Sequence, residues 1–161
     1  DHSSCNYKKT NKSNLIVNKG IRIIKKNIVF ENNYWKISGS HDGYLKKFQT
    51  IHEREIEFYP EQMKFIGYDK LLRKDNSQEI KFDIRFHLDP SSKAMKTQDN
   101  RSILIELEEE GWKFNCENFD INIDNGLYLG IKNSYKENQN ICVSGISKEK
   151  NQIIKWEITR I

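Results

Sequence analysis

The stretch that decides the fold is IKFDIRFHL, residues 80–88. Apolar and polar side chains alternate along it without a break. One face would carry Ile80, Phe82, Ile84, Phe86 and Leu88, and the other Lys81, Asp83, Arg85 and His87. Because successive side chains of a β-strand point to opposite faces of a sheet, this pattern predicts a strand with one face in a core and the other in water.

The same alternation recurs along the chain and predicts an all-β fold. Its clearest repeats are Trp112, Phe114 and Cys116, then Phe119, Ile121 and Ile123, and finally Ile154, Trp156 and Ile158. Shorter strands are predicted at residues 15–18, 21–24, 35–38, 54–58, 64–68, 103–107, 127–129 and 141–144. Turn signals lie at residues 18–20, Asn32-Asn33, Asp42-Gly43, Asp89-Pro90, Glu110-Gly111 and Asn125-Gly126. Strands spaced about every 8–12 residues, without a sustained helical period, predict an antiparallel β-sandwich.

Length and composition fit a single packed domain. The 161 residues are enough for one core, and an aromatic content of 11% supports packing in a chain that is 31% charged. No apolar run reaches the roughly 18 residues that a membrane-spanning helix needs. The net charge is +4, and Lys and Glu are spread along the whole chain, so no nucleic-acid partner is predicted.

Several kinds of chemistry lack their sequence signals. Cys5, Cys116 and Cys142 have no CxxC spacing, so neither a disulfide framework nor a zinc ribbon is indicated. Only His2 and His41 have loop contexts suited to a metal ligand, and a zinc site needs several converging ligands. The chain has no GxSxG motif for a nucleophile and no glycine-rich loop for phosphate.

His41 lies in the segment Ser40-His41-Asp42-Gly43-Tyr44. A tight Asp-Gly turn would present an imidazole, a carboxylate and a phenol within a few residues. The carboxylate could fix the histidine tautomer, and the phenol could exchange a proton. The alternative interpretation is a surface histidine without a catalytic role.

Two strands carry pairs of cationic side chains. His52 and Arg54 share one face of their strand, and Arg85 and His87 share one face of theirs. If these strands pair, the side chains would form a patch able to bind carboxylates. The favoured alternative is that the neighbouring acids Glu53, Glu55 and Asp83 form ordinary cross-strand ion pairs.

The segment SGSHDGYLKKFQTIHEREIEF, residues 38–58, followed by FDIRFHLDP, residues 82–90, resembles the C-terminal β domain of heparinase II/III-like proteins. Further matching points are Asp1-His2-Ser3-Ser4, Glu110-Gly111-Trp112-Lys113-Phe114, Tyr128-Leu129-Gly130 and Ile154-Lys155-Trp156. The similarity runs in order through essentially the whole chain, which makes it more specific than any one motif.

The resemblance implies an N-terminal α/α toroid followed by this β-sandwich, with an acidic polysaccharide bound in the cleft between them. Residues 1–161 would then be the β-sandwich domain, without the toroid and without the first part of the domain. Proteins of this kind cleave uronate-containing polysaccharides by β-elimination. A group neutralises the C5 carboxylate, a base removes the C5 proton, and an acid protonates the departing glycosidic oxygen.

In that family most of the chemistry comes from the toroid, so this chain alone is expected to be inactive. The β domain adds a wall, sometimes a histidine, and in several members a bound zinc. His2 is the candidate metal-binding or cleft-lining residue, with Ser4 where threonine is common. His41 is the candidate catalytic residue, with Tyr44 as its polar neighbour. The candidate substrate-binding residues are His52, Arg54, Arg85 and His87.

Two other functions fit the same sequence. A non-catalytic module for acidic glycans would use the His/Arg strand surface with Tyr34, Trp35 and Tyr44, because aromatic rings stack on sugars. A bracing domain would instead bury a large apolar face against the toroid. By the resemblance, the source is a bacterium and the protein acts in the periplasm or cell envelope, with a cytoplasmic location left open.

Overall fold

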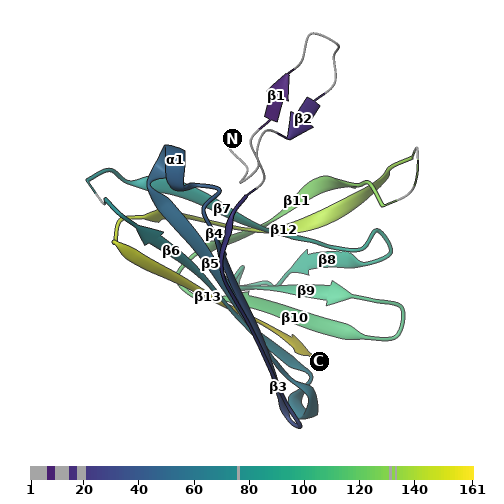
Figure 1. Cartoon of the computed structure of the whole chain (residues 1–161). Coiled ribbons are helices and arrows are strands. Elements are labelled where there is room, and N and C mark those ends of the chain that lie inside the picture. The colour runs from purple at the N-terminus through teal and green to yellow at the C-terminus, as the bar shows by residue number, and fades with distance from the viewer. Residues whose placement is uncertain (1–6, 10–14, 18–20, 76, 131, 133) are drawn as a thin grey trace.

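The computed structural model describes residues 7–9, 15–17, 21–75, 77–130, 132 and 134–161, with side chains from residue 21 onward. Antiparallel β-strands dominate this part of the chain (Figure 1). The first two, β1 (Tyr7–Lys9) and β2 (Leu15–Val17), pair with each other in a two-stranded sheet. His2, Cys5 and the turn signal at residues 18–20 lie outside the described residues.

The largest sheet has eight strands in the order β3-β4-β5-β6-β13-β10-β9-β8. Along the chain these are β3 (Ile23–Glu31), β4 (Tyr34–His41), β5 (Thr50–Tyr59), β6 (Lys64–Arg73), β8 (Lys93–Lys96), β9 (Ser102–Glu106), β10 (Gly111–Cys116) and β13 (Asn151–Arg160). The helix α1 (Leu45–Phe48) connects β4 to β5, and the 3-10 turn η1 (Pro60–Gln62) connects β5 to β6.

A second layer is a three-stranded sheet in the order β11-β12-β7. Its strands are β7 (Ile80–His87), β11 (Asp120–Tyr128) and β12 (Lys136–Ser147). The stretch that dominates the sequence pattern forms β7 as predicted, and Phe82, Ile84 and Phe86 pack in the core. Apolar side chains of β11 and β12 lie beside them in register, because Ile84 pairs with Val143, which pairs with Ile121.

The core lies where the two sheets meet. Its buried apolar residues are Ile84, Ile103, Ile105, Phe114, Cys116, Ile121, Ile141, Val143, Ile154 and Trp156. The ring of Phe86 joins the layers, with centroids 4.9 Å from Phe114 and 4.8 Å from Trp156. Each fully buried large apolar side chain contributes about 1.5–3 kcal/mol, so this interface is the main source of stability. The antiparallel β-sandwich predicted from the alternation is confirmed.

One predicted turn is wrong. Asn125-Gly126 lies inside β11, and Gly126 pairs directly with Asn138 of β12. Gly126 allows the side chains of Asn138 and Asn140 to lie against the strand, because a Cβ atom there would collide with them where they stand. The strand β8, with the sequence KAMK, showed no apolar alternation, and Ala94 is its residue that packs against the core.

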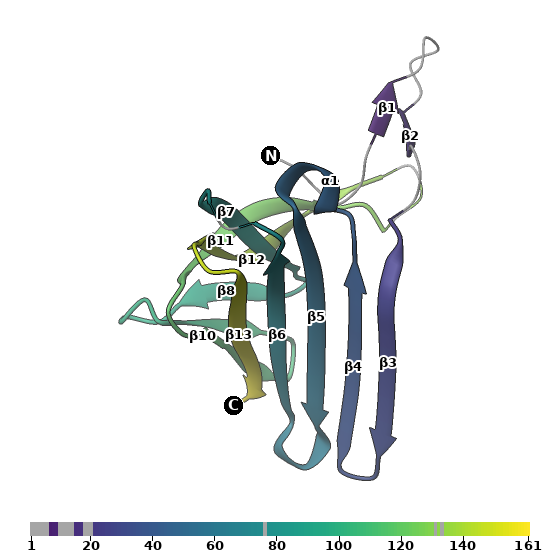
Figure 2. The same cartoon turned by 60° about the vertical axis from the view of Figure 1, so that its left-hand side comes forward.

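The three-stranded sheet covers only part of the large one. We call the face of the large sheet that carries the core its inner face. The strands β3 and β4 lie at the end farthest from the second layer (Figure 2), and apolar side chains there stay exposed. These are Ile28, Phe30, Trp35 and Ile37, which the strand register places together on the inner face. We call these four residues the apolar patch.

Candidate functional site

Polar side chains gather on the inner face at the opposite end of β4 and β5 from the apolar patch. His41 ends β4 and pairs with His52 of β5, while Arg54 pairs with Asp69 of β6. Directly opposite residues of antiparallel strands point to the same face, so these side chains converge. With the neighbouring Tyr44 and Trp156 they form a group that we call the His–Asp cluster: His41, Tyr44, His52, Arg54, Asp69 and Trp156.

Asp69 is the centre of this cluster and is fully buried, with an exposed fraction of 0%. His52 Nε2 lies 2.6 Å from its Oδ1, and Arg54 Nε donates to the same oxygen over 2.8 Å. The indole Nε1 of Trp156 donates to Oδ2 over 2.8 Å. Burial by itself raises the pKa of Asp69, but the hydrogen bonds from His52, Arg54 and Trp156 outweigh it and hold the pKa below the usual value.

Trp156 reaches Asp69 because of a glycine on the neighbouring strand. Gly67 pairs with Trp156, and the indole lies so close over it that a Cβ atom at this position would collide with the ring. Any side chain on residue 67 would therefore displace the indole from the carboxylate. The need for close approach, not for an unusual backbone angle, explains this glycine.

A hydrogen-bond chain leads from Asp69 to the loop after β4. His41 Nε2 lies 3.1 Å from His52 Nδ1, and the backbone N–H of Gly43 donates to His41 Nδ1 over 3.2 Å. Because His41 Nδ1 accepts, the proton of neutral His41 is on Nε2, which donates to His52 Nδ1. His52 then carries its proton on Nε2, which faces the carboxylate of Asp69. All of these hydrogen bonds point toward Asp69.

His41 is half-buried and neutral in this arrangement. Burial lowers its pKa from the usual value of 6.5, and the nearby His52 and Arg54 act in the same direction against the opposing effect of Asp42. Both of its ring nitrogens are engaged within the chain of hydrogen bonds. His41, predicted as a catalytic residue, therefore forms hydrogen bonds with His52 and Gly43 and is also partly exposed to solvent.

Tyr44 lies beside the two imidazoles. Its ring centroid is 5.6 Å from that of His41 and 6.3 Å from that of His52. Among the described residues none forms a hydrogen bond with its hydroxyl. The loop that carries it is fixed by two hydrogen bonds between Asp42 and Arg22. The Asp42 N–H donates to the backbone oxygen of Arg22, and the Arg22 N–H donates to the side-chain Oδ1 of Asp42.

Arg54 uses only part of its guanidinium group. The Nε atom is bound to Asp69, and the group lies over the ring of Phe86 at 5.7 Å from the centroid. No described residue accepts a hydrogen bond from its two terminal nitrogens. The Arg54 side chain as a whole is 37% exposed. A guanidinium held at one edge in this way can bind a carboxylate bidentately with the other.

The predicted four-residue cationic patch does not form. The strands β5 and β7 belong to different sheets, and Arg85 and His87 face away from Phe86 on the outer side of β7. Arg85 there binds Asp124 over 2.8 Å. The alternative of cross-strand ion pairs holds for Glu53 and Glu55, because Lys70 binds Glu53 over 3.1 Å and Lys36 binds Glu55 over 2.9 Å. It does not hold for the pair of Asp83 with Arg85, which are 3.8 Å apart on the same strand.

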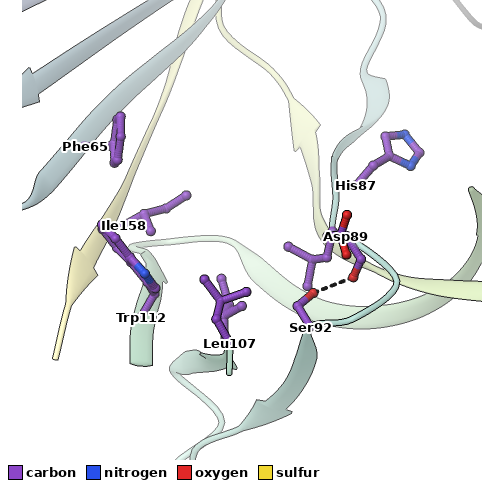
Figure 3. A pocket seen from close by; sticks show the side chains of 9 residues that line it. Phe65, His87, Asp89, Ser92, Leu107, Trp112 and Ile158 are labelled. Carbon is purple, nitrogen blue, oxygen red and sulfur yellow. Dashed lines mark hydrogen bonds between the residues drawn. The ribbon is translucent and has the colours of Figure 1, made fainter. Parts of the chain in front are cut away.

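His87 lines a separate hollow of about 260 Å³, shown in Figure 3. The walls are mainly apolar and include Phe65, Leu107, Trp112 and Ile158. On the other side Ser92 Oγ donates to Asp89 O over 2.7 Å. A second, more polar hollow lies between residues 96–102 and 115–122 and is lined by Cys116. Burial raises the pKa of the Cys116 thiol to about 12, so it is a poor nucleophile.

The His–Asp cluster does not fit the zinc ion that the resemblance implies. The N–H of Gly43 points at His41 Nδ1, so His41 Nε2 must carry the proton and has no lone pair for a metal. Within the described residues, no three His, Cys, Asp or Glu side chains converge as a metal site requires. His2, the predicted metal ligand, lies outside them.

Asp69 and Trp156 are the members of the cluster that the sequence interpretation missed as functional residues. A signal for Asp69 is present in β6, where Phe65, Gly67, Asp69 and Leu71 share one face. An acid in the apolar register of a strand indicates a buried carboxylate, which must have partners. Those partners come from two other strands, β5 and β13, so no local pattern identifies them.

Comparison with known proteins assigns the family. The Heparinase II/III-like, C-terminal family matches residues 1–157, so the chain belongs to this family. Comparison with curated proteins gives no significant match. No described helix has the length and apolar character needed to cross a membrane.

Two solved structures of heparinase III share the fold. The first has a TM-score of 0.66 at 14% identity, over 86% of this chain and 21% of that one. The second, with methylated lysines, has a TM-score of 0.63 at 14% identity, over 85% of this chain and 21% of that one. This chain therefore spans about a fifth of the length of these heparinase III chains.

Proposed function

We propose that this chain is the C-terminal domain of a polysaccharide lyase that cleaves uronate-containing polysaccharides by β-elimination, and that it lines the substrate cleft. Membership of the heparinase II/III-like family supports the reaction class. The observation that carries the role of this domain is Arg54, a partly exposed guanidinium that is anchored by a buried carboxylate and whose terminal nitrogens have no acceptor among the described residues. Such a group matches the carboxylate of a uronate.

Within this proposal each residue has a defined role. Arg54 binds the C5 carboxylate and thereby stabilises the negative charge that develops when the C5 proton leaves. A base in the rest of the protein takes that proton, the C4–O bond breaks and a C4–C5 double bond forms. The hydroxyl of Tyr44 is the group of this domain that can protonate the departing oxygen, and His41 and His52 hold it in place.

The test uses the full-length protein and a panel of uronate polysaccharides, with the ultraviolet absorbance of the unsaturated product as readout. Replacing Arg54→Lys keeps the charge but removes the bidentate edge. Loss of such charge-assisted hydrogen bonds lowers kcat/KM by about ten- to a hundredfold. The matched control is Arg85→Lys on the outer side of β7, which leaves kcat/KM unchanged.

Two outcomes would oppose the proposal. Equal activity of the Arg54→Lys and Arg85→Lys variants would remove Arg54 from the substrate site. Binding of uronate oligosaccharides without any unsaturated product would instead make the domain a non-catalytic module for acidic glycans, in which Arg54 still binds the carboxylate.

The apolar patch supports a second role, that of bracing the remainder of the same protein. Phe30 is 72% exposed and Ile28 60%, and the ring of Phe30 stacks on Trp35 at 4.7 Å. Exposed apolar surface of this kind marks an interface. If it is buried against another domain, Phe30→Asp lowers the unfolding temperature of the full-length protein, whereas Lys26→Asp on the same strand does not. Equal unfolding temperatures for the two variants would contradict a bracing role.

A further inference from the structure

We propose that Asp69 and His52 are positioning residues for Tyr44, and that they act through a chain of hydrogen bonds whose direction is set by the buried carboxylate. This inference rests on the proposed function for the role of Tyr44, but the chain itself is a property of the fold. Tyr44 touches the ligand in this scheme, whereas Asp69 lies beneath it and is fully buried.

The chain begins at Asp69, which has only acceptor atoms when it is ionised. His52 must therefore present its proton at Nε2, over 2.6 Å, and its Nδ1 is left as an acceptor. That acceptor requires a donor from His41 Nε2 at 3.1 Å. The remaining nitrogen of His41, Nδ1, is then an acceptor as well, and the N–H of Gly43 meets it. Each tautomer follows from the one before it.

The last link fixes the residue next to Tyr44. Gly43 is held by His41, and the following turn closes when Leu45 N–H donates to Asp42 O over 2.9 Å. Tyr44 lies between these two hydrogen bonds, with its ring against His41 and Phe48. Loss of the His41 bond would leave Gly43 without an acceptor and give the Tyr44 hydroxyl a wider range of positions.

One added proton anywhere on the two imidazoles breaks this arrangement. A second proton on His41 places a donor at Nδ1 against the donor of Gly43. A second proton on His52 turns His41 Nε2 into an acceptor and moves its proton to Nδ1, with the same result. The charged groups around the pair are Arg54 and Asp69 on the sheet and Asp42 on the loop. The hydrogen bond from Gly43 to His41 therefore needs the tautomers described above, whereas the Asp42–Arg22 hydrogen bonds of the loop do not depend on them.

The first test reads the tautomers directly and does not depend on activity. Full-length protein labelled with ¹⁵N in its histidines shows, by NMR, which ring nitrogen of each carries the proton. The signals of His41 and His52 are assigned from their loss in the His41→Gln and His52→Gln variants. We expect Nε2–H on both residues. A proton on Nδ1 of His41 at neutral pH would overturn the proposal, whatever the protein's activity.

The second test separates positioning from general stability. His52→Phe keeps a flat ring but removes both hydrogen bonds, whereas His52→Gln keeps one donor and one acceptor. We expect His52→Phe to lower kcat roughly tenfold with little change in KM, because Arg54 stays in place, and His52→Gln to restore most of the loss.

The decisive comparison is whether the losses of kcat in the two single variants add up in the double variant. If His52 acts through Tyr44, the double variant His52→Phe/Tyr44→Phe is no slower than Tyr44→Phe alone. Additive losses in the double variant would contradict the positioning role. Absence of product from the wild-type protein on every polymer would instead reject the proposed function, and the tautomers would still decide whether the chain of hydrogen bonds exists.

Discussion

The two faces of β5 use charge in opposite ways. On the outer face Glu53 and Glu55 each meet a lysine of a neighbouring strand, Lys70 or Lys36, so acids and bases alternate across the sheet. On the inner face His52 and Arg54 converge on one buried acid, Asp69. In the outer pairs each acidic side chain is paired with a lysine of the opposite charge. In the inner group, the terminal nitrogens of Arg54 have no acceptor among the described residues. Hydrogen-bond donors of this kind on a partly exposed side chain can bind a ligand.

The largest expected effect comes from removing the acid at the centre. Asp69→Ala leaves His52, Arg54 and Trp156 without their shared acceptor, and losing one partner of a buried charge group costs about 3–5 kcal/mol. Urea unfolding of the protein followed by tryptophan fluorescence measures the change. The control is Asp83→Ala on the outer side of β7, where the expected change is within about 0.5 kcal/mol. A small change in the unfolding free energy of Asp69→Ala would mean that the inner group contributes no more to stability than the outer ion pairs.

A smaller effect is expected at the glycine beneath Trp156. Gly67→Ala forces the indole away from Asp69, and overpacking of this kind costs about 1–3 kcal/mol. Gly39 of β4 also lies on the inner face, and a Cβ atom there would make only an ordinary van der Waals contact, 3.6 Å from Lys25 O. Gly39→Ala is therefore the matched control and changes the free energy of unfolding by less than about 0.5 kcal/mol. Equal effects at the two glycines would show that Trp156 is not held by close packing.

Acidification should weaken the inner group in two steps. His41 has a folded-state pKa below 6.5, so the unfolded chain binds a proton first and stability falls as the pH drops below about 6.5. Asp69 has a folded-state pKa below 3.8, so a second loss follows as the pH drops below that value. Unfolding temperatures measured across this range test both steps. In His41→Gln the first step should shrink, and an unchanged profile would contradict its assignment.

The smallest effect is expected on the outer face. Lys36→Ala removes one ion pair with Glu55, and such pairs contribute about 0–1 kcal/mol because solvent and salt screen them. The unfolding free energy of this variant should approach that of the wild type as salt is added. If Lys36→Ala lost as much unfolding free energy as Asp69→Ala, or if its loss did not depend on salt, the two faces of β5 would not differ in how they use charge.

The sequence predicted the fold better than it predicted the site. Alternation is a local property, so β7, β10 and β13 could be found from single stretches such as residues 80–88. The turn at Asn125-Gly126 was wrong because the same glycine also allows close packing of Asn138 and Asn140, and composition does not separate the two causes. The helix α1 was missed because Leu45–Phe48 is too short to show a helical period.

The candidate site was only half predictable. His41, Tyr44, His52 and Arg54 stood out by residue type, and the register of β4 with β5 brings His41 and His52 together. Arg85 and His87 had the same local pattern as His52 and Arg54, yet they lie in the other sheet. Which strands pair is a long-range property. The two segments by themselves therefore do not tell that His52 and Arg54 both meet Asp69, whereas Arg85 binds Asp124.

The position of β13 also bears on how the domain is made. Of the strands in the large sheet, β13 is the last to leave the ribosome, yet it lies between β6 and β10. Until residues 151–160 emerge, the sheet exists as two pieces with open edges, and Asp69 lacks Trp156. Open strand edges are where nascent chains associate wrongly. The large sheet can therefore be completed only after its last strand has emerged, and the same strand also brings Trp156 to the site.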